Sequence, residues 1–360
     1  MVDGGGLENR RGESPREFES HPLRQQSRGG RADSALHRLA RSLPDPVKRP
    51  LHRIASLGQP AFEAGFSRAR GRKAAGPTRS FTLRLPEPPP DVDRAISRTH
   101  PSSLAIEAPA HLFVPQQLDA EGLAGYYRTT LATFLAAADL TDGAIFDVGA
   151  NVGIFALLAA ALTPRPVVAF EPTPELAFVL RWTAAANSLQ LMTQEIALGA
   201  EDGYATLYLS PTDTSNSLRA GFRRRARGSV EVRVRRLDSY CRGSLFPALM
   251  KIDTESTEPD VLRGAGAILS ERRPWLICEV LAGRTEEALE QVLRPLGYTW
   301  YRIGEETPFP VHDRIVGDPV YEETDWLFTP EPAPPLLWRR IDAWQAALRA
   351  CGPTRELPIA

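Results

Sequence analysis

The chain contains 360 residues with a mass of 39.6 kDa, enough to bury one large core and to carry additional segments. Hydrophobic residues make up 42% and charged residues 24%, an ordinary balance for a globular protein, and the formal net charge of −1 indicates no charged partner. No apolar run approaches the roughly 18 residues that a membrane-spanning helix needs, and no apolar signal core follows the first charges. We therefore expect a cytoplasmic protein without a membrane span.

The three cysteines, Cys241, Cys278 and Cys351, lie far apart and are odd in number. Their spacing fits neither a disulfide framework nor a cysteine-ligated metal site. The pattern favours reduced thiols, and we assign no metal ligands from the sequence.

Residues 1–80 differ in charge from the rest of the chain. They carry 16 Lys and Arg against 8 Asp and Glu, and they are predicted to form a basic, largely disordered region. Apolar residues of 35–43 recur at helical spacing, which is typical of a loosely docked surface helix or of a basic helix that binds membranes or nucleic acids. The basic run at 68–73 has no interleaved aromatic residues, so a nucleic-acid partner is not predicted.

Residues 81–140 are predicted to form a linker and an N-terminal helical extension. The Pro-rich run Leu85–Pro90 is typical of a stiff spacer. Ala120–Ala138 is predicted to be a helix that precedes the core.

Residues 141–330 alternate between short apolar runs and helical stretches. The expected strands are 144–148, 166–171, 194–198, 205–209, 230–234, 249–253, 275–280, 299–303 and 325–329, and the expected helices are 152–162, 174–187, 260–269 and 285–296. This alternation predicts an α/β domain whose mostly parallel sheet has helices on both faces. Ligands of such sheets bind at the carboxyl ends of the strands. Residues 331–360 are predicted to be a C-terminal tail with a helix.

The turn after the first of these strands reads Asp147-Val-Gly-Ala-Asn-Val-Gly153. Gly149 allows a sharp turn close to a ligand, and Gly153 allows the next helix to lie near the sheet. Backbone N–H groups at this helix start favour a carboxylate or another anion. Asp147 is placed to hold an ammonium group or an ordered water. Because Asn151 stands where dinucleotide sites have a central glycine, the turn does not fit that class; a tight turn without a ligand is the alternative.

The next strand ends in a single acid, Glu171, directly before a proline. An acid at this position accepts hydrogen bonds from ribose hydroxyls. It follows Asp147 by 24 residues, close to the roughly 20 expected for one strand–helix–strand unit. The pair therefore predicts an adenosine site.

Several ordered motifs resemble the FkbM-type methyltransferases. They are Asp147–Gly153, Phe170–Pro172, Lys251–Glu255 followed by Glu258, Val261–Ala265, and Arg273-Pro274 followed by Glu279. The resemblance spans about residues 145–329. It implies a Rossmann-like class I methyltransferase fold with a mostly parallel seven-stranded sheet, S-adenosyl-L-methionine as cofactor, and methyl transfer to a hydroxyl oxygen of a sugar or another small metabolite.

The sequence departs from the family pattern at one position. The family usually has Asp-x-Glu-Gly-x-Glu, whereas this chain has Asp253-Thr-Glu255-Ser256-Thr-Glu258. Glycine at such a position normally marks unusual dihedral angles or a close approach. The three acids are present, and a methyltransferase-like scaffold without catalytic activity is the alternative that Ser256 keeps open.

The three acids are the candidate catalytic residues. A methyl sulfonium is already activated, so the protein has to hold an oxygen nucleophile in line with it and exclude water. A carboxylate can accept the proton that the hydroxyl loses, and Asp253, at the end of a central strand, is the first candidate. Glu255 and Glu258 are candidates for orienting the hydroxyl or balancing the sulfonium charge; for Glu258 the alternative is a helix N-terminal charge.

Two further segments have alternative interpretations. Thr214–Leu218 is a candidate lid loop, although a plain polar turn is favoured. Arg223–Arg227 is a candidate for binding an acidic acceptor, although a solvated charge run is favoured. A nicotinamide-dependent oxidoreductase is disfavoured by the missing glycine, and no motif supports nucleic-acid methylation. The expected partner is a hydroxylated small molecule; the sequence does not indicate an oligomeric state.

Overall fold

The computed structural model describes residues 77–90, 100–222, 226–242 and 245–354. The predicted disorder of residues 1–76, the helix at 35–43, the basic run at 68–73 and Arg223–Arg225 lie outside these residues. No helix in the described part of the chain is long and apolar enough to cross a membrane.

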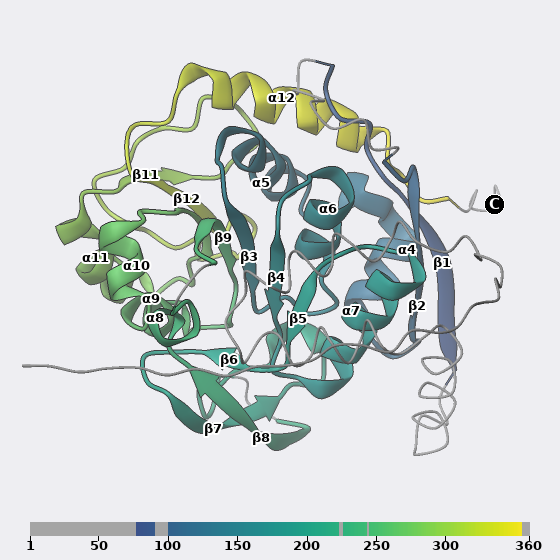
Figure 1. Cartoon of the computed structure of the whole chain (residues 1–360), viewed down its shortest axis with the longest axis horizontal. Helices are drawn as coiled ribbons and strands as arrows, with labels where there is room; N and C mark the ends of the chain where they lie inside the picture. The colour runs from purple at the N-terminus through teal and green to yellow at the C-terminus, as the bar shows by residue number, and fades with distance from the viewer. Residues whose placement is uncertain (1–76, 91–99, 223–225, 243–244, 355–360) are drawn as a thin grey trace, which may run out of the picture.

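A seven-stranded sheet forms the centre of the molecule (Figure 1). Its strands are, in spatial order, β11 (Thr299–Arg302), β12 (Asp325–Thr329), β10 (Trp275–Glu279), β9 (Pro247–Ile252), β3 (Ala144–Val148), β4 (Val167–Phe170) and β5 (Met192–Gln194). Neighbours are parallel except that β12 is antiparallel to both β10 and β11. The strand order reverses beside β3, the point at which ligand crevices open in such sheets. The predicted mostly parallel sheet is confirmed.

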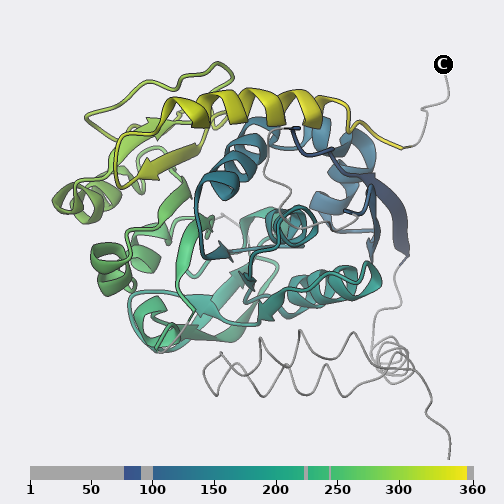
Figure 2. The ribbon, with the colours of Figure 1, turned by 45° about the horizontal axis from the view of Figure 1, so that its top comes forward.

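Helices cover both faces of this sheet (Figures 1 and 2). One layer contains α5 (Arg128–Leu140), α6 (Ile154–Leu162), α7 (Pro174–Ala186) and α12 (Pro335–Arg349), and the other contains α8 (Leu237–Tyr240), α9 (Glu258–Arg263), α10 (Gly266–Glu271) and α11 (Glu286–Leu293). Side chains alternate along each strand, so Ile145 and Leu249 join the first core while Phe146 and Met250 join the second. Both faces are therefore apolar, as parallel sheets require.

A smaller three-stranded sheet lies below the main sheet in Figure 1 and consists of β6 (Ala197–Leu198), β8 (Gly228–Arg235) and β7 (Gly203–Leu209). The prediction of one strand over 194–198 is wrong. Its first residue ends β5, which pairs with β4, whereas Ala197 and Leu198 pair with β8. The chain changes sheets between them, which a short apolar run cannot reveal.

The predicted helix Ala120–Ala138 is also wrong in its extent, because the structure has two helices, α4 (Phe113–Gly125) and α5. Tyr127 between them has a positive φ of 40°. Within α4 the backbone is kinked at Gly122, with φ 63°, where a Cβ would collide with the backbone of Cys351. The distant C-terminal segment thus shapes this helix.

The segment 81–140, expected to be a linker and a helical extension, begins within a hairpin of β1 (Thr78–Arg84) and β2 (Ser103–Pro109). Asn187, at the end of α7, exchanges two 2.8 Å hydrogen bonds with the backbone of Ala105. Leu85 and Pro86, at the start of the Pro-rich run, are buried. These residues are part of the packed fold and not a spacer.

The predicted helix at 260–269 is divided into α9 and α10, and the one at 285–296 ends as a 3₁₀ turn, Arg294–Leu296. Gly264 lies at the first break, where a Cβ would collide with the carbonyl oxygen of Gly199. The small sheet and this helix layer approach each other closely at this glycine.

Candidate functional site

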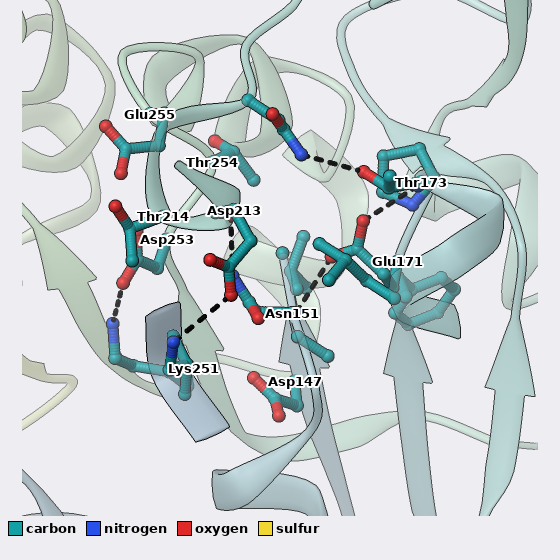
Figure 3. A pocket seen from close by; sticks show the side chains of 18 of the residues that line it. Asp147, Asn151, Glu171, Thr173, Asp213, Thr214, Lys251, Asp253, Thr254 and Glu255 are labelled. Atoms are coloured by element: carbon teal, nitrogen blue, oxygen red, sulfur yellow. Dashed lines mark hydrogen bonds and ion pairs between the residues drawn. The ribbon is translucent and has the colours of Figure 1, made fainter. Parts of the chain in front are cut away.

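A cavity of about 230 Å³ opens at the carboxyl ends of β3, β4, β9 and β10. Around it lie the turn after β3, the start of α7, the loop at 213–218 and the loop after β9 (Figure 3). The junction of α4 and α5 also lines it. It lies at the reversal of strand order, where the sequence predicted the site.

Gly149 and Asn151 form the turn that lines this cavity. Gly149 has a φ of 78°, and a Cβ there would collide with the carbonyl oxygen of Asp253 at the end of β9. Its N–H donates to the carbonyl of Phe170 at 2.9 Å. Asn151 also has a positive φ, 54°, which asparagine tolerates better than most residues. The turn therefore joins three neighbouring strand ends at close range.

Gly153 precedes α6 with a φ of 84°, and a Cβ there would collide with the Leu180 side chain of α7. The expectation was close packing against the sheet. The structure shows instead that the glycine makes room for the neighbouring helix.

Asp147 lines the cavity but is 2% exposed. Its carboxylate accepts a 3.0 Å hydrogen bond from the N–H of Ala156, in the first turns of α6. Burial raises the pKa of Asp147 to about 7, although Lys251 and the Ala156 N–H oppose the shift. The carboxyl group thus fixes the start of α6 from beneath the cavity.

Glu171 joins the turns that follow β3 and β4. One carboxylate oxygen accepts the N–H of Asn151 at 2.8 Å and the other accepts the N–H of Thr173 at 2.7 Å (Figure 3). Burial raises the pKa of Glu171 to about 7, while hydrogen bonds from Thr173 and Asn151 oppose the rise. A carboxylate offers about four acceptor positions, so Glu171 retains capacity for a ligand hydroxyl.

The loop 213–218 closes over the same turn. Asn151 donates from its side chain to the carbonyl of Asp213 at 2.8 Å. The Asp213 carboxylate in turn accepts the N–H groups of Phe113 and Val114, at 2.5 and 3.3 Å, at the start of α4. The favoured interpretation of 214–218 as a plain polar turn missed this position at the cavity, because α4 lies 100 residues away in sequence.

Asp253 and Glu255 line the opposite end of the cavity together with Glu279, and one carboxylate oxygen of each lies within 4.8 Å of the others. Burial raises the pKa of Glu279 well above its usual value, and Asp253 and Glu255 add to the shift. Sequence reasoning did not select Glu279 as a site residue. Its signal was the same as that of Glu171, a single acid at the carboxyl end of a buried strand.

Lys251 was also missed as a site residue. Its ammonium group is 3.2 Å from Asp253 Oδ2 and 3.2 Å from Asp325 Oδ1, and the residue is 2% exposed. It supplies positive charge beside the carboxylate group just described. The sequence did contain a signal for Lys251: it is the penultimate residue of a buried strand, and the strand is followed directly by the acid Asp253.

Glu258 is fully buried and does not line the cavity. One carboxylate oxygen accepts the N–H groups of Thr254 and Ser256, at 2.8 and 3.1 Å, and the Thr254 hydroxyl at 3.1 Å. Burial raises its pKa to about 7. Glu258 therefore holds the loop after β9 from behind.

Ser256 adopts the backbone that its sequence position suggested. Its φ is 83°, next to Glu255 with a φ of 56°. The serine is 1% exposed and its hydroxyl has no hydrogen-bond partner. The chain thus keeps the glycine-type conformation with a residue that is strained in it.

A second chamber of about 420 Å³ adjoins the first, because Tyr127, Thr214, Glu255 and Glu279 line both. Its remaining wall includes Phe222, Leu281, Arg284 and Tyr321. The Arg284 guanidinium stacks over the Phe222 ring at 5.0 Å. Two connected spaces therefore meet at the carboxylates after β9 and β10.

The sheet order, its one antiparallel strand and a cavity at the tips of β3 and β4 define a class I methyltransferase fold. The model of the FkbM methyltransferase domain family matches residues 147–302. Residues 147–302 therefore match an FkbM methyltransferase domain, a family whose reaction implies S-adenosylmethionine as cofactor.

Solved structures that match part of this chain include an FkbM methyltransferase from Methylobacillus flagellatus, with 18% sequence identity and a TM-score of 0.35; the match covers 52% of this chain and 43% of that chain. The 16S rRNA methyltransferase RsmC of T. thermophilus matches with 12% sequence identity and a TM-score of 0.37. That match covers 71% of this chain and 52% of RsmC. A ribosomal protein L11 methylase from Lactobacillus delbrueckii matches with 14% sequence identity and a TM-score of 0.33. That match covers 58% of this chain and 80% of the methylase. The chain thus spans less than half of the Methylobacillus protein. No curated protein sequence matches.

Proposed function

We propose that the protein transfers a methyl group from S-adenosylmethionine to a hydroxyl oxygen of a small acceptor, a sugar or another hydroxylated metabolite. The observation that carries this proposal is the junction of the two chambers, where Asp253, Glu255 and Glu279 gather beside the cofactor-type cavity. One chamber suits the cofactor, and the other suits the acceptor.

The cofactor-type cavity fits an adenosyl group by two observations. Glu171 retains acceptor capacity at the tip of β4 for ribose hydroxyls, and Gly149 leaves a ligand-accessible turn in which a side chain has no room. We assign the ribose to Glu171 and the amino-acid end to the region of Asp147 and Gly149–Gly153. When bound, S-adenosylmethionine supplies an electrophilic methyl group.

The acceptor chamber has the composition that a hydroxylated ring requires. The rings of Tyr127 and Tyr321 line this chamber and suit the apolar side of a sugar. Glu255 offers a carboxylate for hydroxyl groups. Asp253, whose side chain is 38% exposed, is our candidate for the group that accepts the hydroxyl proton.

The test is a transfer assay with S-adenosylmethionine tritiated in its methyl group. Methyl α-glycosides of common hexoses and deoxyhexoses, simple phenols and primary amines serve as acceptors. We expect label on hydroxylated acceptors and none on amines. Transfer to amines alone would contradict O-methylation, and binding of the cofactor without transfer to any acceptor would favour a non-catalytic scaffold.

A further inference from the structure

Lysine is rare in this chain. Of the 43 basic residues only Lys48, Lys73 and Lys251 are lysines, and all others are arginines. Among the residues that the structure describes, Lys251 is the only lysine, and it is almost fully buried. At this position lysine supplies a compact ammonium group where arginine would place a planar guanidinium.

The Lys251 ammonium group contacts three side chains, and one of them is itself held by a fourth. Besides the ion pairs with Asp253 after β9 and Asp325 on β12, the Phe155 ring of α6 lies 5.3 Å from Nζ. The second oxygen of Asp325 accepts a 2.8 Å hydrogen bond from the Thr130 hydroxyl on α5. The ammonium position is therefore set by the rigid core.

The two ion pairs differ in their access to the cavity. The side chains of Lys251 and Asp325 are 2% and 6% exposed, whereas that of Asp253 is 38% exposed. Lys251 therefore contacts Asp253 from the protein interior (Figure 3). The rest of the Asp253 carboxylate remains open to the cavity.

The surroundings of this pair are acidic. Its other titratable neighbours are Asp147 on β3, Glu279 on β10, Glu255 and Glu258 around the loop after β9, and Tyr126 and Tyr127 between α4 and α5. Burial would lower the pKa of Lys251, but Asp253 and Asp325 hold it well above its usual value. Lys251 therefore places a positive charge among these acids.

Resting on the proposed function, we propose that Lys251 is a positioning residue for methyl transfer, which directs the Asp253 carboxylate toward the acceptor hydroxyl. In the reaction the acceptor oxygen bonds to the methyl carbon while the S–CH₃ bond breaks and its electron pair stays on sulfur. The hydroxyl proton passes to Asp253. Lys251 acts through Asp253 and exchanges no proton itself.

The test removes the ammonium group together with its interior counter-charge, because Lys251→Met alone would leave Asp325 buried and unpaired. The variants are Lys251→Met/Asp325→Asn, Asp253→Asn and the triple variant. Arg339→Met, at an exposed position of α12, is the control for replacing a cation by methionine. Each is assayed with the tritiated cofactor and a methyl glycoside that the wild type methylates.

We expect Lys251→Met/Asp325→Asn to lower kcat at least 100-fold, with KM and the Kd of S-adenosylmethionine changed less than threefold. We expect Asp253→Asn to lower kcat by the same factor. The triple variant should have a kcat no lower than either of these variants, because the groups act as one unit. Wild-type kcat in the Lys251 variant would overturn the proposal. The proposal would also be overturned if the kcat of the triple variant fell by the product of the two separate factors. It would be overturned as well if only the affinity for S-adenosylmethionine fell.

Two further measurements distinguish the lysine pairing from a metal-dependent reaction and from a failure of the proposed function. Activity that vanishes in EDTA and returns with Mg²⁺ would overturn the proposal, since a divalent ion would then balance the acids in place of Lys251. If the wild type methylates no acceptor, the proposed function fails, and ¹⁵N spectra of the lysine ammonium groups test the pairing alone. A Lys251 signal that shifts in Asp253→Asn supports the pairing, and an unchanged signal contradicts it.

Discussion

Carboxylates line both ends of the cavity, but the protein holds them differently. At the tips of β3 and β4, Asp147 and Glu171 are buried and accept hydrogen bonds from backbone N–H groups of adjacent turns. At the tips of β9 and β10, Asp253 and Glu279 lie near one another, and the nearby cation is a buried lysine. We propose that the first end cradles the cofactor and that the second, where the charges are concentrated, carries the chemistry.

The largest effect is expected at the cradle. Gly149→Ala should remove detectable binding of S-adenosylmethionine and lower the free energy of unfolding by at least about 2 kcal/mol, because the new Cβ meets the Asp253 carbonyl at a positive φ. Urea unfolding and calorimetry measure the two effects. Gly266→Ala, where a Cβ meets no atom within 4 Å, is the control. Normal binding by Gly149→Ala would show that the turn is not a cradle.

The next effect concerns pH. Burial holds the pKa of Glu171 at about 7 without ligand, and ribose hydroxyls donate to the ionised form. Cofactor affinity should therefore weaken as pH falls through 7, by up to about tenfold per unit below it. Calorimetry from pH 5.5 to 8.5 tests this, and the dependence should flatten in Glu171→Gln. A flat wild-type profile would argue against a contact with Glu171.

Stability should change in the opposite direction over the same range. Burial raises the folded-state pKa values of Asp147, Glu171 and Glu258 to about 7. The folded protein thus binds protons that the unfolded chain has released, so this contribution is complete below the unfolded values near 4 and is lost as pH rises through 7. Urea unfolding of the cofactor-free protein should give a lower free energy at pH 8 than at pH 5. A rise over this range would mean that these groups are ionised when folded.

The smallest effect is expected at the charged end. Ser256→Gly should raise the free energy of unfolding by about 1 kcal/mol, since it removes a positive-φ strain and an unpaired buried hydroxyl at some cost in chain entropy. Methyl transfer should stay within about twofold of the wild type. Thermal unfolding and the transfer assay test both. Destabilisation by glycine would mean that the serine hydroxyl has a partner.

The two ends of the cavity also differ in how well the sequence predicts them. Asp147, Gly149 and Glu171 belong to one strand–helix–strand unit, so local spacing was enough to place them at one cavity. The roles of Lys251 and Glu279 depend on strands that meet only after folding, and Asp325 lies on β12, the last strand along the chain. Glu258 is the third acid of the motif that contains Asp253 and Glu255. It turns away from the cavity, because Glu255 and Ser256 adopt positive φ angles.

The fold shows a similar limit. Alternation of apolar runs predicted the central sheet, whereas the kink in α4 depends on Cys351 and the division of 194–198 depends on β8. Each of these features is imposed by a segment distant in sequence. Local patterns carry no information about such contacts.

Calorimetric titration of S-adenosylmethionine into the wild type, Glu171→Gln and Glu175→Gln tests the location of the cofactor most directly. Glu175 is four residues from Glu171 but does not line the cavity. The account predicts one binding site per chain, at least tenfold weaker in Glu171→Gln and unchanged in Glu175→Gln. Equal affinities in all three proteins would contradict it, as would a wild type that does not bind the cofactor.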